Sequence, residues 1–392
     1  MKPTILMFCP QFRPLVGGAE RQAEKLAEAL VRIGCRVVIL TPRIDPNSPD
    51  SEEINGVIID RFPLNDLARR YPLSGIALLN IPYILWQIFN AVKPRLHESD
   101  ILHCHSASLQ TVGAGIAGFL ADVPVLCKAA TGDKRSDLGK IEETGVSGLL
   151  VAWLARFVIG TWVATTSAVG DALICAGVKP DKIMNIPNGA KLSINPNVQA
   201  KVGGVKHFLY LGRLSKNSQR DIPTVISAFD RLAAAHKDIE LAIVGGGDLY
   251  DITRCQIDAC QARERIFLPG FDKPEPWLFW ADCFVLPSRR EGLSNALLEA
   301  MAAGLPCIAN DILPNREVLA DGKAGVLVPV GDEDRLFEAM LSMVDDADHA
   351  LAMRVAALIR VESHYSIEAV AASYMSLYTE LIRKPSNDPQ NS

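Results

Sequence analysis

One pattern recurs along this chain and restricts its fold more than any other feature: a short apolar run, a turn, and a stretch with helical periodicity. It first occurs where residues 4–9, TILMFC, precede the periodic segment AERQAEKLAEALVRIG at residues 19–34. It begins again at residues 207–211 and 240–244. Continuous apolar runs of this length are typical of parallel strands covered on both faces, and their alternation with helices indicates βαβ units. The chain is therefore expected to be α/β.

The length of the chain predicts more than one domain. At 392 residues it exceeds what one ordinary core accommodates. Residues 190–205 are polar and rich in Asn, Gly and Pro, which is typical of a linker. We therefore expect domains at residues 1–190 and 206–362. A last amphipathic helix is expected at residues 363–384, followed by a disordered tail.

Composition and charge exclude several classes of function. A net charge of −5 provides no electrostatic footprint for nucleic acid, so no nucleic-acid partner is expected. The nine cysteines show no CxxC pair, and the sequence shows no cluster with the spacing of metal ligands. The first apolar run is too short for a signal peptide. We therefore expect a cytoplasmic protein without a bound metal.

Two longer apolar stretches, residues 76–92 and 146–163, could contact a membrane. The first contains Pro82 and is at the short limit for a transmembrane span. The second carries Arg156 near its centre, which would be costly in hydrocarbon. Both are expected to be buried helices of an α/β domain. The alternative is that one face rests on the inner surface of a membrane, beside a lipid-linked acceptor.

Residues 281–306, ADCFVLPSRREGLSNALLEAMAAGLP, carry the most informative polar side chains. They predict a strand, a turn and a helix, with Ser294 as the N-cap. Glu299 follows inside an apolar helix, where a carboxylate is costly unless donors or a ligand satisfy it. Glu291 lies in the turn before the helix, where backbone N–H groups and the helix dipole favour an anion.

The pattern E-G-x-S-x-x-x-x-E, followed by A-M-A-A-G-x-P, resembles the E-x7-E motif of retaining GT-B glycosyltransferases of the family 4 group, the glycosyl transferases group 1. The resemblance implies two Rossmann-like domains facing a cleft, with the last helix crossing back to the first domain. By the same resemblance, Glu291 and the backbone of Gly292, Leu293 and Ser294 meet the donor sugar and diphosphate, and Glu299 holds the ribose.

The pair Gly17–Gly18 lies between the first predicted strand and helix. Glycines there let the backbone approach a phosphate and leave N–H groups pointing at it. The motif G-x-G-x-x-G is absent, which weakens a dinucleotide-binding interpretation. GGAER resembles the N-terminal glycine loop of the family, which faces the donor phosphates, although a plain turn explains two glycines equally well.

The segment DILHCH at residues 100–105 predicts a strand that ends in two histidines. Alternation places His103 and His105 on one side and Cys104 on the other. Open α/β sheets bind ligands at these strand ends, although a strand-end histidine can also simply bond to nearby backbone. The segment resembles the family pattern D-x-x-H-x-H, whose later histidine lines the sugar site. We therefore select His105 as the candidate histidine of the sugar site.

Three cations, Arg213, Lys216 and Arg220, are crowded into one loop after residues 207–211. Cations repel one another unless they share a polyanion, so a diphosphate is a suitable ligand. The family shows G-R-L and then K-G, but this loop is longer. Arg213 matches the arginine of the family pattern. For the lysine of that pattern two alternatives remain: Arg220 replaces it, or Lys216 extends into its place.

Two further positions resemble donor contacts of the family. Gly245 begins a glycine turn after residues 240–244, where a tight turn requiring positive φ is an equal explanation. Phe271 follows residues 266–270 and could pack beside the nucleotide base. In contrast, Leu313 and Pro314 replace the usual glycines before Glu317, so that glutamate is given no ligand role.

The resemblance implies a retaining glycosyltransferase that moves a hexose from a UDP- or GDP-linked sugar to an acceptor hydroxyl, in polysaccharide or glycolipid assembly. His105, Arg213 and Glu291 would be catalytic, and the leaving phosphate would serve as base. Apart from the donor, no cofactor or metal is expected, because the cations and the helix N-terminus stabilise the leaving phosphate. A GT-B-type nucleotide-sugar epimerase and a non-catalytic nucleotide-sugar-binding subunit remain alternatives.

Overall fold

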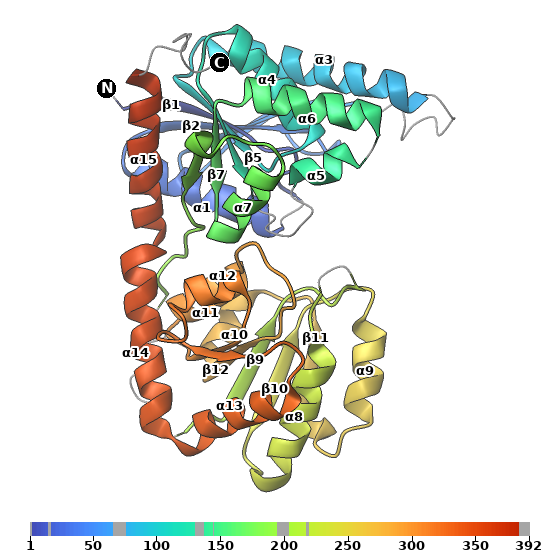
Figure 1. Ribbon diagram of the computed structural model, residues 1–392, viewed down its shortest axis with the longest axis vertical. Coiled ribbons are helices and arrows are strands. Elements are labelled where there is room, and N and C mark those ends of the chain that lie inside the picture. Colours follow the sequence, from blue (N-terminus) through green and yellow to red (C-terminus); the bar gives the residue numbers. More distant parts are fainter. Residues whose placement is uncertain are drawn as a thin grey trace. The chain divides into compact units, whose positions relative to one another are not determined.

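The chain forms two compact units, each built around a mainly parallel β-sheet (Figure 1). The computed structural model describes residues 2–14, 17–65, 76–129, 137–143, 145–193, 204–216 and 219–383. Unit 1 comprises Met1–Gly189 and Ile367–Ser392, and unit 2 comprises Ala190–Ser366. The predicted tail after residue 384 and most of the predicted linker, residues 194–203, lie outside the described residues.

The sheet of unit 1 has eight strands in the order β3-β4-β2-β1-β5-β6-β7-β8. β3 and β4 form an antiparallel hairpin, and the other neighbouring strands in this sheet pair in parallel. The central strands β5 and β6 are buried along their whole length, as expected for strands covered on both faces. The strands are β1 (Thr4–Phe8), β2 (Arg36–Pro42), β3 (Ser51–Ile54), β4 (Val57–Phe62), β5 (Ile101–His105), β6 (Val125–Ala129), β7 (Thr161–Ala164) and β8 (Ile183–Asn185).

Helices cover both faces of this sheet. One face packs against α1 (Gly18–Arg32) and the C-terminal helix α15 (Ile367–Arg383). The opposite face packs against α3 (Ile76–Leu96), α4 (Leu109–Leu120), α6 (Val146–Val158) and α7 (Ser167–Cys175), and the short helix α5 (Asp137–Glu142) adjoins α6. Strand alternation decides which side chain reaches which layer, so that Ile101 meets the α1 and α15 layer and Leu102 meets the other.

The expectation that residues 146–163 form one buried helix is wrong. The helix α6 ends at Val158, and Thr161–Ala164 is strand β7. Moreover, α6 is apolar on two sides: Val151 and Ala152 lie in the core, whereas Trp153 is 55% exposed. Hydropathy alone could not reveal which apolar side faces outward. Among the described residues, no helix combines the length and the apolar character needed to cross a bilayer.

The sheet of unit 2 has six parallel strands in the order β11-β10-β9-β12-β13-β14. They are β9 (His207–Leu211), β10 (Glu240–Val244), β11 (Ile266–Gly270), β12 (Cys283–Leu286), β13 (Cys307–Asn310) and β14 (Val326–Val328). One face packs against α8 (Ile222–Ala235), α9 (Tyr250–Asp258) and α13 (Glu333–Asp345). The other packs against α10 (Pro274–Trp280), α11 (Asn295–Ala302), α12 (Leu313–Val318) and α14 (Ala347–His364).

The boundary of unit 2 is set by hydrogen bonds at its start. The Ala190 amide donates to the Tyr365 carbonyl at 2.7 Å, and the Ser193 amide donates to the Ala302 carbonyl at 3.1 Å. Unit 2 therefore includes residues 190–193, which the sequence analysis placed in a linker.

Three loops meet at the carboxyl edge of the unit 2 sheet because glycines follow β10. The Leu214 amide donates to the Gly246 carbonyl at 3.0 Å, and the Gly245 amide donates to the Gly270 carbonyl at 2.8 Å. Gly245 has φ of +155°, and a Cβ atom there would lie 1.7 Å from the Gly212 carbonyl oxygen. This approach of backbone to backbone therefore requires glycine at position 245.

We expect Gly245→Ala to lower the free energy of unfolding of unit 2 by about 1–3 kcal/mol or more, because strained backbone and a direct clash with a carbonyl both oppose it. Gly246→Ala is the matched control, since its Cβ would make only an ordinary contact, 3.7 Å from Phe271. Thermal unfolding of both variants measures the difference. Equal melting temperatures for the two variants would contradict the requirement for glycine.

Candidate active site

An ion pair at the carboxyl edge of the unit 2 sheet joins the loop after β9 to the turn after β12. Arg220 Nη1 donates to Glu291 Oε1 and to Ser288 Oγ. Ser288 Oγ in turn donates to Glu291 Oε1 at 3.0 Å. A backbone bridge between Arg220 and Ser288 holds the two segments together. The structure thus brings together two predicted site residues from distant parts of the sequence.

Arg220 retains a donor that no described residue satisfies. Its side chain is 16% exposed and that of Glu291 is 12% exposed. Arg220 Nε is buried and has no hydrogen-bond partner among the residues that the structure describes. A buried donor without an acceptor costs free energy, and a ligand oxygen would remove that cost. The adjoining Tyr210 is also enclosed: burial raises its pKa to about 12, although Arg220 opposes the rise.

The turn that contains Glu291 leads directly into α11. Ser294 caps the helix, and its Oγ accepts a hydrogen bond from the Leu297 amide at 3.3 Å, which confirms the predicted N-cap. The positive end of the α11 dipole therefore lies beside the Arg220–Glu291 pair. Gly292 and Leu293 fill the turn between Glu291 and the cap. Glu299 lies further along α11 and is partly exposed, while its neighbours in sequence are buried.

The other predicted donor contacts lie on adjoining loops of the same edge. The Tyr210 hydroxyl donates to the Arg213 carbonyl at 3.3 Å, and the Lys216 amide donates to Asp248 Oδ1 at 3.3 Å. Both Arg213 and Lys216 are exposed. Phe271 is 81% exposed, and its Cβ is 3.7 Å from the position that a Cβ at Gly246 would occupy. An aromatic ring therefore stands open to solvent beside the glycine turn.

In unit 1, His105 belongs to a buried polar cluster. The rings of His103 and His105 stack with centroids 4.2 Å apart, which confirms that they share one side of β5. His103 Nδ1 lies 2.7 Å from the Tyr378 hydroxyl of α15, so His103 is tied into the core. His105 is 5% exposed, and its Nε2 has no hydrogen-bond partner in the described ranges of the chain. Burial, reinforced by Lys128, lowers the pKa of His105 to about 3, so its ring is neutral near pH 7.

Lys128 is a residue that the sequence analysis did not single out. It pairs with His105 in the β5–β6 ladder and is 6% exposed. Burial lowers its pKa from 10.5 to about 7. The sequence signal for it is a lysine near the end of the otherwise apolar strand VLCKA, because a lysine is almost never fully buried unless it is paired.

The structure also corrects the expectation for the glycine loop. The Gly17 amide donates to the Glu20 carboxylate at 2.8 Å, in the manner of a capping box, so it does not point freely at a ligand. Gly17 has an extended backbone, and Gly18 is the first residue of α1. The prediction of free N–H groups is therefore wrong for Gly17.

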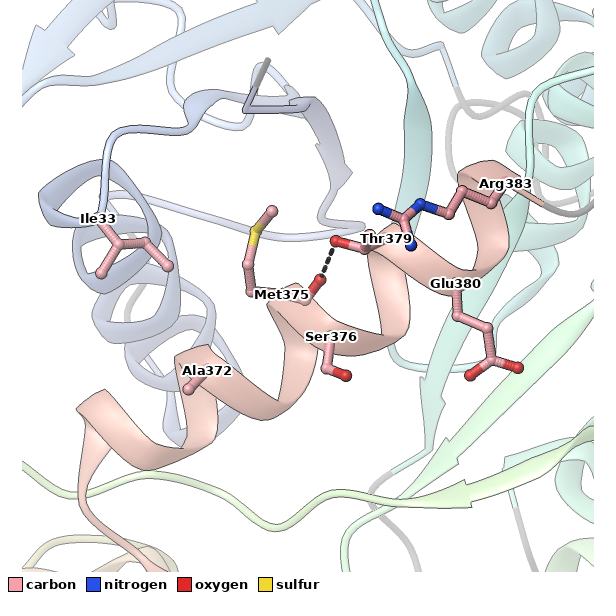
Figure 2. A pocket seen from close by; sticks show the side chains of 7 residues that line it. All are labelled: Ile33, Ala372, Met375, Ser376, Thr379, Glu380 and Arg383. Atoms are coloured by element: carbon pink, nitrogen blue, oxygen red, sulfur yellow. Dashed lines mark hydrogen bonds between the residues drawn. The ribbon is translucent and has the colours of Figure 1, made fainter.

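A surface hollow of about 780 Å³ lies beside α1 and α15 (Figure 2). Ile33, Met375, Thr379 and Arg383 are among the residues that line it, and Thr379 Oγ1 donates to the Met375 carbonyl at 2.8 Å. None of the predicted site residues is among the described residues that line this hollow. Within the described ranges, no three His, Cys, Asp or Glu side chains are grouped as metal ligands.

The fold and the comparisons with known proteins indicate the same class of protein. Two Rossmann-like units with parallel sheets define the GT-B fold. The structure of HepE from Anabaena in complex with UDP superposes with a TM-score of 0.72, covering 96% of this chain and 100% of that one at 18% identity. Residues 193–358 match the family model described as glycosyl transferases group 1, and residues 17–189 match the glycosyl transferase 4-like domain. The chain belongs to this family of glycosyltransferases.

Two relatives with assigned names are similar over nearly the whole chain. The phosphatidyl-myo-inositol mannosyltransferase of Mycobacterium leprae is 26% identical and covers 95% of each chain. The glycogen synthase of Mycobacterium tuberculosis is 27% identical over 95% of this chain and 94% of its own. The names of these two relatives refer to different molecules, one to a phospholipid and one to a polysaccharide.

The buried Lys128 makes stability depend on pH. Between its lowered pKa near 7 and the ordinary 10.5, the unfolded chain binds a proton that the folded chain does not, so the free energy of unfolding rises with pH. Below pH 7 the folded state carries the full cost of a buried charge.

We expect Lys128→Met to raise the melting temperature below pH 7 and to lose that advantage above pH 10. The exposed Lys93→Met is the control, and a Lys128→Met variant less stable at every pH would contradict the argument.

Proposed function

We propose that the protein is a retaining glycosyltransferase that moves a hexose from a UDP- or GDP-linked sugar to an acceptor hydroxyl. The observation that carries the proposal is the Arg220–Ser288–Glu291 cluster beside the N-terminus of α11, in which Arg220 keeps a buried donor that no residue of the described ranges satisfies. Sites at the carboxyl ends of parallel strands commonly bind nucleotides.

Arg213 and Arg220 are the proposed cations for the donor diphosphate. Glu291 and Ser288 hold the Arg220 guanidinium in one orientation, and a phosphate oxygen that entered beside its buried Nε would satisfy that donor. The side chain of Lys216 is exposed, and within the described part of the chain it makes no ion pair like that of Arg220. Arg220 is therefore the better candidate for the position of the lysine in the family pattern. Because the Arg220–Glu291 pair is close to neutral, Arg213 and the α11 dipole supply the net positive potential.

Glu291 is the proposed contact to the transferred sugar. Its carboxylate is fixed by Arg220 and Ser288, and a fixed acceptor can orient a sugar hydroxyl without reorganisation during the reaction. The acceptor oxygen would attack the anomeric carbon from the face that the phosphate leaves. As the bond between the anomeric carbon and the phosphate oxygen breaks, the leaving phosphate takes the proton of the acceptor hydroxyl. No divalent metal is needed if the two arginines and the helix N-terminus stabilise the departing charge.

The remaining predicted residues have supporting roles in this proposal. Glu299 holds the ribose, and the exposed ring of Phe271 offers a stacking surface for the base. His105 would contact the sugar as a neutral hydrogen-bonding group, since its pKa is about 3. Gly17–Gly18 can contact phosphate only if the ligand competes with Glu20 for the Gly17 amide.

Unit 1 is the proposed acceptor domain, and the acceptor is a sugar or a lipid-linked sugar. The similarity to a mannosyltransferase named for a phospholipid supports a role in glycolipid or polysaccharide synthesis. In that setting the protein would work in the cytoplasm, in peripheral contact with the inner face of the membrane.

Incubation of the protein with UDP- and GDP-hexoses, followed by NMR of the sugar anomeric proton, tests the proposal. We expect slow donor hydrolysis that first releases the sugar with its original anomeric configuration and that continues in EDTA. Glu291→Gln should lower this rate by about a hundredfold or more. The exposed Glu338→Gln, also in unit 2, is the control.

Other outcomes of this experiment identify the alternatives. Release of the inverted anomer would overturn the retaining mechanism, and loss of activity in EDTA would overturn metal independence. Free nucleotide with a sugar altered at another carbon would indicate an epimerase. Nucleotide binding without any release would indicate a non-catalytic binding subunit.

A further inference from the structure

The outer side of α6 carries a continuous stripe of large apolar residues. Their spacing of three or four residues places them on one face of the helix. Their exposed fractions range from 53% to 85%, although the opposite face of α6 is already buried in the core of unit 1. The stripe consists of Val146, Leu149, Leu150, Trp153 and Phe157.

The stripe continues onto the end of the neighbouring helix α4. Phe119 is 49% exposed and Leu120 is 68% exposed. The Phe119 ring lies 5.1 Å from the Phe157 ring, and Trp153 stacks on Phe157 at 5.9 Å between centroids. Together these side chains form one surface, which we name the α4–α6 face: Phe119, Leu120, Val146, Leu149, Leu150, Trp153 and Phe157.

The core of unit 1 does not require this surface. The buried sides of α4 and α6 pack against the sheet without it, and isolated exposed apolar residues would need no explanation. Seven adjoining large apolar side chains are different, because contiguous patches of this kind mark a surface that something covers.

Charge and side-chain type indicate a lipid bilayer as the covering partner. The helices α3, α4 and α6 themselves contain no Asp or Glu, and their charged residues are Lys93, Arg95 and Arg156. Arg95 pairs with Asp60 at 3.0 Å and Arg156 pairs with Glu142 of α5 at 2.7 Å, so Lys93 is the exposed cation of these helices. The chain as a whole is acidic, with 45 Asp and Glu against 40 Lys and Arg. The helices that carry the apolar stripe thus present no carboxylate of their own to repel anionic headgroups. Tryptophan and phenylalanine on the outside of a helix are also typical of side chains that enter the membrane interface.

We propose that the α4–α6 face docks unit 1 on the surface of a lipid bilayer, with Trp153 and Phe157 inserted at the boundary between headgroups and acyl chains. The proposed function includes a peripheral membrane contact, and the α4–α6 face would be the part of the chain that makes it. The purpose of docking, which is to hold unit 1 beside an acceptor in the membrane, rests on the proposed function, whereas the docking itself does not. Binding to lipid needs neither donor nor acceptor.

Flotation with vesicles tests the proposal. The full-length protein is incubated with vesicles of equimolar phosphatidylcholine and phosphatidylglycerol, and in parallel with phosphatidylcholine alone. We expect the wild type to float with both and more strongly with the anionic vesicles. The double variant Trp153→Ser/Phe157→Ser should lower the partition coefficient by about tenfold or more.

A matched pair of leucines provides the control. Leu149 and Leu351 are each 53% exposed, but Leu351 lies on α14 of unit 2. Leu149→Ser should weaken flotation and Leu351→Ser should not. Equal effects of the two substitutions on flotation, or a wild type that floats with neither kind of vesicle, would overturn the proposal. If the wild type were instead a dimer that Trp153→Ser/Phe157→Ser converts to monomer without any vesicle binding, the occupant would be a second copy.

Nucleotide binding separates this proposal from the proposed function. A nucleoside diphosphate that stabilises the wild type should stabilise the Trp153→Ser/Phe157→Ser variant equally in thermal unfolding, because unit 2 is unchanged. An equal shift also shows that the variant is folded. Vesicle binding without any nucleotide response would leave the docking surface standing and overturn the proposed function instead.

Discussion

The contact between Arg220 and Glu291 is the interaction on which the site in unit 2 depends. It connects a loop after β9 to a turn after β12, and these strands are neighbours in the sheet although distant in sequence. A partly buried ion pair is a modest source of stability, but removal of either partner leaves an uncompensated charge. The pair therefore fixes the relative position of the two segments more than it stabilises the fold. Ser288 completes the arrangement by bonding to both charged groups.

The close approach of the neighbouring loops depends on backbone geometry. Gly245 and Gly247 adopt φ values of +155° and +149°, and added Cβ atoms would collide with the carbonyls of Gly212 and Leu214. The loop after β10 can thus lie directly against the loop that carries Arg213. Cations, a helix N-terminus and an exposed aromatic ring are consequently gathered at one edge of one sheet. These are the groups that a diphosphate and a base require.

Much of the fold could be predicted from the sequence, because buried parallel strands give continuous apolar runs. The strands near residues 207–211 and 240–244 and the cap at Ser294 are confirmed. The β3–β4 hairpin was missed, although Asn55–Gly56 is a recognised turn signal and both residues have positive φ. The exposed side of α6 could not be predicted, because hydropathy does not distinguish two apolar faces. The contact of Glu20 with Gly17 and the burial of Lys128 depend on tertiary neighbours that spacing does not reveal.

Calorimetric titration with UDP and GDP of the wild type, Arg220→Ala and Lys216→Ala tests the central claim most directly, namely that Arg220, oriented by Glu291, binds the donor diphosphate. One of the two nucleotides should bind the wild type. Arg220→Ala should weaken that binding by at least about tenfold, which corresponds to about 1.4 kcal/mol, whereas Lys216→Ala should change it by no more than about threefold. The opposite order of the two variants, or no binding of either nucleotide to the wild type, would contradict the claim.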